Sequence, residues 1–404
     1  MLNRLLHLSI TVFIFAILAA CGSNDEPTPP APKETHRTVL VYMVADNNLG
    51  SDYHYDQADM KEMLTGVKNG GLNGGRLLIY RNRPGTASGN APQMLEVTPE
   101  GITQLKTYPD DSEIYSVSAD RMKEVLADMK SLAPAAEYGI VFWGHATSWL
   151  THPSDLEGRS NSPIKRSYGT DRDKWMSLST LGETLAGEEF CFIYFDCCLM
   201  GTVEVAYELR HVTPVIVASP TELEGEGMPY DRNIAPFFAS GEPKLIDAAT
   251  NTFDYYNSIP GRTCQMVVIN TAALDGLAEA SRAVFSQQTD FPESLWSIQE
   301  LSKAHRRFFY STSTCSDCHP VYDMDHYIST IASPELYSAW TEALNEVVLY
   351  KATTQREFTG INVTRYCGLG SYVVRLKNHG DYHGYTQTQW WKDVVSKAPV
   401  LTDK

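Results

Sequence analysis

Two apolar stretches that each stop at reactive side chains decide the fold of this chain. They are Tyr138-Gly-Ile-Val-Phe-Trp-Gly-His145 and Phe190-Cys-Phe-Ile-Tyr-Phe-Asp-Cys-Cys-Leu-Met-Gly201. A continuous apolar run of this length, bounded by glycine and polar residues, is typical of a strand buried on both faces of a parallel sheet. Ligands of open α/β sheets bind beyond the carboxyl ends of such strands. We therefore expect His145 and the segment Asp196–Cys198 to meet at one edge of a sheet.

A histidine next to a cysteine is the minimum that a thiolate nucleophile requires. Neighbouring side chains in a strand point in opposite directions, so Cys197 and Cys198 are expected to point apart. Taken alone, His145 is better explained as a hydrogen-bonded core histidine. Its pairing with the cysteine strand favours a catalytic role instead.

The rest of the chain alternates between strand and helix patterns, which predicts an α/β sheet with helices on both faces. Further strands are expected at 37–45, 76–81, 213–219 and 264–270, and helices at 55–67, 118–132, 178–186, 202–210, 243–258 and 272–286. The polar residues 151–174 predict a long loop, and long loops in compact domains are usually functional. In the last third, a helix is expected at 334–352 and a strand at 368–376.

The N-terminus has the pattern of an export signal. Arg4 precedes the apolar run Leu5–Ala20, which is short for a membrane span. The run ends in Leu18-Ala-Ala-Cys21, which resembles a bacterial lipobox. That resemblance implies a lipoprotein signal peptide over residues 1–20 and a lipid on Cys21. An ordinary secretory signal with an incidental cysteine is the alternative.

The residues after Cys21 predict a flexible tether over 21–36, because they are rich in proline, serine and acids and lack apolar periodicity. Gly22 resembles an outer-membrane sorting residue, and Ser23-Asn-Asp-Glu26 resembles an acidic surface-export signal of bacterial lipoproteins. We therefore expect an exported protein, held at the outer membrane by its lipid and reaching the cell surface.

The charge of the chain argues against one class of partner. The formal net charge is −16, and removal of residues 1–20 takes away one arginine and no acid, which makes it −17. Nucleic-acid binding needs a basic surface, so this class is disfavoured, whereas cationic substrates are attracted. Of eight cysteines, a lipidated Cys21 leaves an odd number, so at least one thiol should stay free.

Three motifs resemble the clostripain family of cysteine peptidases. They are Trp143-Gly-His145 with Ser148-Trp149, Asp196-x-Cys198-Leu-Met-Gly201 with Glu204 and Tyr207-Glu-Leu209, and Tyr42-Met-x-Ala-Asp-Asn-Asn-Leu49. The resemblance is specific over residues 37–235. It implies a caspase-like three-layer α/β/α sandwich with a mostly parallel central sheet and a C-terminal extension. The expected organisation is a peptidase core over 37–260, followed by a C-terminal part over 261–404 that continues or flanks the sheet.

The resemblance also implies an activity. The family uses a Cys–His dyad, cleaves after Arg or Lys, and often cuts its own chain between the two catalytic residues. It implies His145 as the base and Cys198 as the nucleophile, because the family's cysteine stands two residues after the aspartate. Cys197 is then a small buried side chain or a redox partner. It also implies that the N–H groups of Cys198 and Ala146 bind the oxyanion. The family has glycine at the position of Ala146.

In family terms Asp196 lines S1, the pocket for the residue on the amino side of the cleaved bond (P1). A carboxylate suits a cationic P1 side chain. A helix-capping role for Asp196 is the alternative. Glu226, or its neighbour Glu224, is a candidate second carboxylate, although such loop acids are usually solvated. The 151–174 loop contains five candidate self-cleavage sites, namely Arg159, Lys165, Arg166, Arg172 and Lys174. The alternative is that this segment is simply a polar loop.

One further motif, Cys315-Ser-Asp-Cys318-His319, matches the attachment pattern of c-type haem. With Asp323 and His326 it would equally suit zinc, but a disulfide or free thiols are expected instead. The prediction is therefore a monomeric peptidase without metal or cofactor. Some family members depend on calcium, and no compact calcium-loop motif is present. The rival interpretations are a catalytically inactive relative that serves as a surface binding module, and a haem-bearing electron carrier.

Overall fold

The computed structural model describes residues 33–83, 91–109, 114–150, 167–172, 174–302, 321–375 and 382–402. Lys33–Lys404 form one compact unit. Several predictions lie outside the described residues: the signal peptide with Cys21, the self-cleavage candidates Arg159, Lys165 and Arg166, and the motif Cys315–His319. Within the described residues, none of the helices combines the length and the apolar character needed to span a membrane.

The centre of the fold is a nine-stranded sheet with the strand order β12-β10-β9-β8-β5-β1-β2-β3-β4. The strands are β1 (Thr35–Met43), β2 (Arg76–Arg81), β3 (Gln93–Thr98), β4 (Gly101–Thr107), β5 (Ala135–Trp143), β8 (Phe190–Asp196), β9 (Val215–Ala218), β10 (Gln265–Asn270) and β12 (Val348–Thr353). The five central strands, from β9 to β2, are parallel. Two antiparallel strands complete the sheet at each edge.

Alternate residues of the central strands supply two separate cores, one on each face of the sheet. In β5, Val141 and Trp143 belong to one core, whereas Ile140 and Phe142 belong to the other. This is the pattern expected of strands buried on both sides, because successive side chains point to opposite faces. The sheet is therefore the middle layer of the predicted three-layer α/β/α sandwich.

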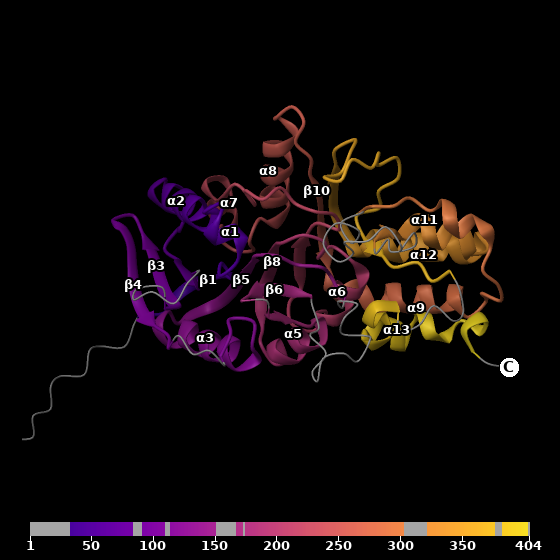
Figure 1. Ribbon diagram of the computed structural model, residues 1–404, viewed down its shortest axis with the longest axis horizontal. Coiled ribbons are helices and arrows are strands. Elements are labelled where there is room, and N and C mark those ends of the chain that lie inside the picture. The colour runs from indigo at the N-terminus through magenta and orange to yellow at the C-terminus, as the bar shows by residue number, and fades with distance from the viewer. Residues whose placement is uncertain are drawn as a thin grey trace, which may run out of the picture. The chain divides into compact units, whose positions relative to one another are not determined.

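Helices cover both faces (Figure 1). One core is closed by α2 (Tyr55–Lys68), α7 (Tyr230–Phe237) and α8 (Leu245–Asn257). The other is closed by α3 (Ala119–Leu132), α5 (Leu178–Leu185), α6 (Val203–Glu208), α9 (Leu274–Phe285), α11 (Met324–Ile331), α12 (Pro334–Val347) and α13 (Gln389–Asp393). Side-chain caps start several of these helices; for example, the side chains of Ser118 and Ser333 accept hydrogen bonds from the first turns of α3 and α12.

Two predictions for the last third are wrong. The helix expected over 334–352 ends at Val347, and the next six residues form β12 along the edge of β10. Val348 and Tyr350 are residue types that favour strands, and the open edge of β10 supplies their backbone partners. Of the strand expected over 368–376, of which 368–375 are described, only Gly370–Ser371 pair, as β13, with β11 (Tyr322–Asp323).

Two hairpins were not expected from the sequence. Strands β3 and β4 form an antiparallel pair beyond β2. The end of the predicted 151–174 loop contains β6 (Tyr168–Asp171) and β7 (Lys174–Met176), which pair with each other. The C-terminal part of the chain contributes β10 and β12 to the main sheet.

Candidate active site

A cavity of about 490 Å³ lies at the carboxyl ends of β5 and β8. This volume is typical of ligand pockets. Trp143 pairs with Asp196 in the sheet, so His145 and Cys198, each two residues further along, reach the same edge. The cavity is lined by Leu49, Tyr53, Tyr55, Trp143, Gly144, His145, Asp196, Cys197, Cys198, residues 222–227, Arg262 and Phe358. The structure thus brings together the two strand ends that the sequence singled out.

His145 is delivered to the cavity by a turn at Gly144. Gly144 has φ of 141°, and a Cβ there would stand 3.2 Å from the carbonyl oxygen of Val44. The ring of His145 is held by Asn48, whose Oδ1 lies 2.7 Å from Nε2. Burial lowers the pKa of His145 to about 4, so the imidazole is neutral at neutral pH.

The contact with Asn48 determines which nitrogen of His145 carries the proton. An amide oxygen only accepts hydrogen bonds, so Nε2 must donate and Nδ1 must hold the lone pair. Asn48 begins α1 (Asn48–Ser51), and Asn47 before it fixes this turn by accepting from the Leu49 N–H at 2.9 Å and donating to the Val44 carbonyl at 2.9 Å. The sequence contained a signal for this role, because Asn48 follows β1, the neighbour of β5.

The two adjacent cysteines point apart, as expected. Cys197 is buried, and its Sγ donates to the carbonyl oxygen of Phe142 at 3.1 Å. Cys198 is partly exposed, and its Sγ accepts from the Leu223 N–H at 3.4 Å. Burial, and then the charge of Glu222, raises the pKa of Cys198 to about 12. In this state both His145 and Cys198 are neutral.

The segment after Cys198 is a short loop that leads into α6. The helix expected near Thr202 does form, but it begins at Val203, five residues after Cys198, with Thr202 as its cap. The Leu223 N–H is the backbone donor to the Cys198 thiol. Leu199, which follows Cys198 directly, has φ of 65°. Its N–H donates to the carbonyl oxygen of Thr221 at 2.9 Å. The nucleophile candidate is therefore held by the strand-to-loop segment after β9.

Ala146 follows His145 directly and is buried. It forms an isolated bridge with Tyr168, in which the Gly169 N–H donates to the carbonyl oxygen of His145 at 2.7 Å. Within the described residues, the N–H of Ala146 itself donates no backbone hydrogen bond.

Asp196 is buried in the floor of the cavity. Its two oxygens accept from the Met228 N–H at 2.9 Å and from the Tyr230 hydroxyl at 3.0 Å. Burial nevertheless raises the pKa of Asp196 to about 7. A Cβ on Gly227, which has φ of 70°, would stand 2.7 Å from Oδ2 of Asp196, so only glycine fits there.

A second buried acid stands close to Asp196. Asp59 on α2 accepts from Nε1 of Trp143 at 2.6 Å. Burial, and then the charge of Asp196, raises the pKa of Asp59 well above its ordinary value. Sequence reasoning did not find Asp59, because its proximity to Asp196 arises only from the packing of α2 on the sheet.

The candidate second carboxylates, Glu224 and Glu226, also line the cavity, but both are paired with Arg262. The guanidinium of Arg262 lies 2.6 Å from Glu224 and 2.5 Å from Glu226. Glu224 additionally accepts from the Thr263 N–H at 3.1 Å. A cationic substrate would therefore have to compete with Arg262 for these two carboxylates.

The two described self-cleavage candidates lie outside the cavity lining. Arg172 stacks over Tyr115 with its guanidinium 4.7 Å from the ring centroid, and Lys174 lies 5.6 Å from the same centroid. The Arg172 N–H donates to the carbonyl oxygen of Asp46 at 3.3 Å. Both residues are thus held in or beside the β6–β7 hairpin.

The residues proposed to join a metal site serve backbone groups instead. Asp323 accepts from the N–H groups of Cys367 at 2.6 Å and His326 at 2.9 Å, and Nδ1 of His326 accepts from the Gln299 N–H at 3.0 Å. In the part of the chain that the structure describes, no three His, Cys, Asp or Glu side chains are arranged to hold a metal ion.

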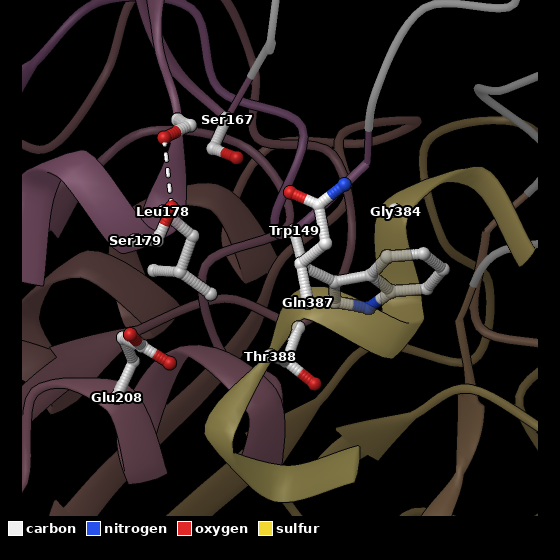
Figure 2. A pocket seen from close by; sticks show the side chains of 9 residues that line it. Trp149, Ser167, Leu178, Ser179, Glu208, Gly384, Gln387 and Thr388 are labelled. Carbon is white, nitrogen blue, oxygen red and sulfur yellow. Dashed lines mark hydrogen bonds between the residues drawn. The ribbon is translucent and has the colours of Figure 1, made fainter. Parts of the chain in front are cut away.

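A much smaller cavity lies beside Trp149, bordered by Gln387 and Thr388 (Figure 2). Its volume of about 20 Å³ holds roughly one water molecule. The indole N–H of Trp149 is buried without a hydrogen-bond partner among the described residues. This cavity is too small for a substrate, so the large cavity around Cys198 is the candidate active site.

Comparisons with known proteins agree with this assignment. The sequence model of the clostripain family matches residues 41–397. The X-ray structure of an inactive zymogen C11 protease from Parabacteroides distasonis has a TM-score of 0.73 and 30% identity, covering 90% of this chain and 99% of that chain. A secreted C11 cysteine protease from Bacteroides thetaiotaomicron, solved in complex with an irreversible peptide inhibitor, has a TM-score of 0.71 and 26% identity, covering 89% and 98%.

No curated protein sequence matches the chain. The family match spans most of the chain, and the structural match extends over nearly the full length of both relatives. The family and the fold predicted from the sequence are both confirmed. This chain belongs to the clostripain family of cysteine proteases.

Proposed function

We propose that this protein is an endopeptidase that cleaves polypeptides after Arg or Lys, with Cys198 as the nucleophile and His145 as the base. One observation carries the proposal: the buried carboxylate of Asp196 lines the same cavity as the partly exposed thiol of Cys198 and the ring of His145. A cationic P1 side chain that pairs with Asp196 would place its carbonyl group beside Cys198. A carboxylate in a partly desolvated pocket suits a guanidinium or an ammonium group.

In the proposed mechanism, Nδ1 of His145 takes the thiol proton of Cys198. The thiolate then attacks the P1 carbonyl carbon and forms a carbon–sulfur bond, while the carbonyl oxygen becomes an oxyanion. The N–H groups of Ala146 and Cys198 would bind this oxyanion. Collapse of the intermediate breaks the peptide bond, and His145 returns the proton to the leaving amine. Water activated by His145 then hydrolyses the acyl-enzyme.

Asn48 would support this cycle by accepting the Nε2 proton of His145. When His145 takes the thiol proton, the resulting imidazolium keeps the same hydrogen bond to the amide oxygen. Because burial opposes a charge on His145, a fixed acceptor at Nε2 stabilises the charged state relative to the neutral one. Asn48 is therefore a positioning residue for the base.

We further propose that the chain cuts itself in the 151–174 loop. In support, the structure of the Parabacteroides relative is that of an inactive zymogen. Lys165 and Arg166 are the preferred sites, because Arg172 and Lys174 are held by the β6–β7 hairpin. A protease needs an extended backbone that can enter its cleft, and a paired hairpin does not offer one.

Export and anchoring complete the proposal. The lipobox at Cys21 supports a lipid anchor at the outer membrane, and the Bacteroides relative is described as secreted. We propose that the protein acts there as a monomer on peptide substrates without a cofactor. Metabolic labelling with palmitate should mark the wild-type protein and leave Cys21→Ala unlabelled. Retention of full activity in a chelator would agree with the absence of a calcium requirement.

The activity is tested with fluorogenic peptides that differ only at P1. The wild-type protein should hydrolyse the Arg and Lys peptides and leave the Gln and Leu peptides intact, whereas Cys198→Ala should hydrolyse none. Equal hydrolysis of all four peptides would contradict the basic preference. Undiminished hydrolysis by Cys198→Ala would contradict the nucleophile.

A further inference from the structure

The turn Glu357–Ile361 is organised by one buried carboxylate. Glu357 is 1% exposed, and its oxygens accept from the Thr359 N–H at 2.8 Å, the Ile361 N–H at 2.7 Å and the Thr359 hydroxyl at 2.6 Å. The backbone adds a hydrogen bond from the Glu357 N–H to the carbonyl oxygen of Ile361 at 3.1 Å. The turn is therefore held in one conformation by its own first side chain.

Phe358 is the residue that this turn presents to solvent. It is 43% exposed and lines the cavity that contains Cys198. A large apolar side chain loses free energy by remaining exposed, and at the mouth of a pocket such exposure marks a binding contact. The rigid turn means that this exposure is built into the fold.

The strand order places Phe358 relative to the two catalytic candidates. The segment that carries it is attached at the start of β10, where Nε2 of Gln265 donates to the carbonyl oxygen of Arg356 at 3.1 Å. The sheet order is β10-β9-β8-β5, with Cys198 after β8 and His145 after β5. Phe358 and His145 therefore lie on opposite sides of Cys198.

The chemistry then orients the substrate. The leaving amine must receive its proton from His145, so the carboxyl-terminal part of the substrate departs on that side. The amino-terminal part must cross the other side of Cys198, towards β10 and Phe358. This step rests on the proposed function, in which His145 and Cys198 act as a dyad.

We propose that Phe358 forms an apolar subsite for the residues that precede P1. The preferred substrates are peptides that carry a large aliphatic or aromatic side chain one or two residues before the basic residue. The substrate side chain would pack on the exposed ring of Phe358, and Glu357 acts as the positioning residue that fixes the ring.

Two fluorogenic peptides with Arg at P1 test this subsite, one with Leu and Phe at the two preceding positions and one with Gly and Ser. The wild-type protein should prefer the apolar peptide. Phe358→Ala should lose roughly tenfold in kcat/KM on the apolar peptide, mainly through KM, and keep its value on the small peptide. Phe358→Leu should retain most of the preference. Ile246→Ala, at a position on α8 that is 44% exposed and outside the cavity lining, should change neither value.

Glu357→Gln tests the positioning role. It removes acceptor strength from the turn, so the preference for the apolar peptide should fall while kcat on the small peptide stays constant. Equal wild-type rates on both peptides, or equal losses on both in Phe358→Ala with an unchanged melting temperature, would overturn the subsite and leave the basic P1 preference intact. No hydrolysis of either peptide by the wild type would overturn the proposed function as well.

Discussion

The side-chain oxygen of Asn48 lies 2.7 Å from Nε2 of His145. This contact joins the loop after β1 to the residue after β5, and it leaves Nδ1 as the nitrogen that can accept a proton. It therefore gives His145 a defined orientation and a defined tautomer before any substrate binds. A catalytic base gains from such preorganisation because its geometry and its protonation state are both set in advance.

Asn48→Ala removes the acceptor at Nε2, so the imidazolium formed during catalysis loses its hydrogen bond. We expect kcat on an Arg peptide to fall by about tenfold or more, with little change in KM. Steady-state kinetics measure both values. Asn48→Asp keeps an acceptor oxygen and should retain more activity than Asn48→Ala. Equal kcat in the wild type and Asn48→Ala would contradict a role for Asn48 in positioning the base.

The pH dependence of kcat/KM should follow the protonation state of the Asp196 carboxyl group. Its carboxyl group is protonated below the raised pKa of about 7 and charged above it, and only the charged form pairs with a P1 cation. His145 stays neutral down to about pH 4, so it does not produce an acid limb near pH 7. We expect kcat/KM for an Arg peptide to rise between pH 6 and pH 8. This rise should disappear in Asp196→Asn, and its persistence there would contradict the assignment.

The same carboxyl group predicts a change in folding stability with pH. The folded chain keeps a proton on Asp196 up to about pH 7, whereas an unfolded aspartate loses it near pH 4. The folded state thus binds more protons in this window, so the free energy of unfolding falls as the pH rises from 4 to 7. Melting temperatures of the wild type and Asp196→Asn should diverge in this range, with the variant gaining relative stability towards pH 7. Parallel melting curves would contradict the raised pKa.

Arg262 competes with a cationic substrate for Glu224 and Glu226. Because Arg262 is 38% exposed, loss of these ion pairs should change the free energy of unfolding by less than about 1 kcal/mol. Arg262→Ala frees the carboxylates, so KM for an Arg peptide should fall about two- to fivefold at low salt. Glu226→Gln is the matched variant and should raise KM. An unchanged KM in Arg262→Ala would mean that these acids do not contact the substrate.

The self-cleavage sites can be separated by paired substitutions. We expect Arg159→Gln/Lys165→Gln/Arg166→Gln to remain uncut, because these three residues precede the paired hairpin, whereas Arg172→Gln/Lys174→Gln should be cut like the wild type. Intact mass measurement identifies the fragments, and Cys198→Ala serves as the uncut reference. Cleavage after Arg172 or Lys174 in the first variant would show that the hairpin opens and would contradict the proposed sites.

The central strands were predictable because burial on both faces leaves continuous apolar runs, as in β5 and β8. The edges were not, because an antiparallel edge strand depends on a neighbour far away in the sequence. Val348–Thr353 continues a helix-like pattern, and only the open edge of β10 turns it into a strand. The β3–β4 hairpin was likewise missed, since its pairing beyond β2 leaves a weak pattern in the sequence.

The candidate site likewise contains some residues that the sequence predicts and others that only the folded structure brings together. His145, Asp196 and Cys198 follow apolar runs directly, so chain order was enough to expect them at one edge. Arg262 and Phe358 reach the cavity through the start of β10, and their arrival there depends on tertiary packing. The Leu223 N–H that donates to the Cys198 thiol comes from the loop after β9, and its position beside Cys198 likewise depends on tertiary packing.

We propose that Cys198, rather than Cys197, attacks substrates with a basic P1 residue. This role of Cys198 is tested most directly by treating the protein with a peptidyl-arginine chloromethyl ketone and mapping the modified cysteine by mass spectrometry. We expect a single adduct on Cys198 that forms in Cys197→Ala and is absent in Cys198→Ala, with much slower labelling by a Leu analogue. An adduct on Cys197, or equal labelling by the Arg and Leu reagents, would contradict it.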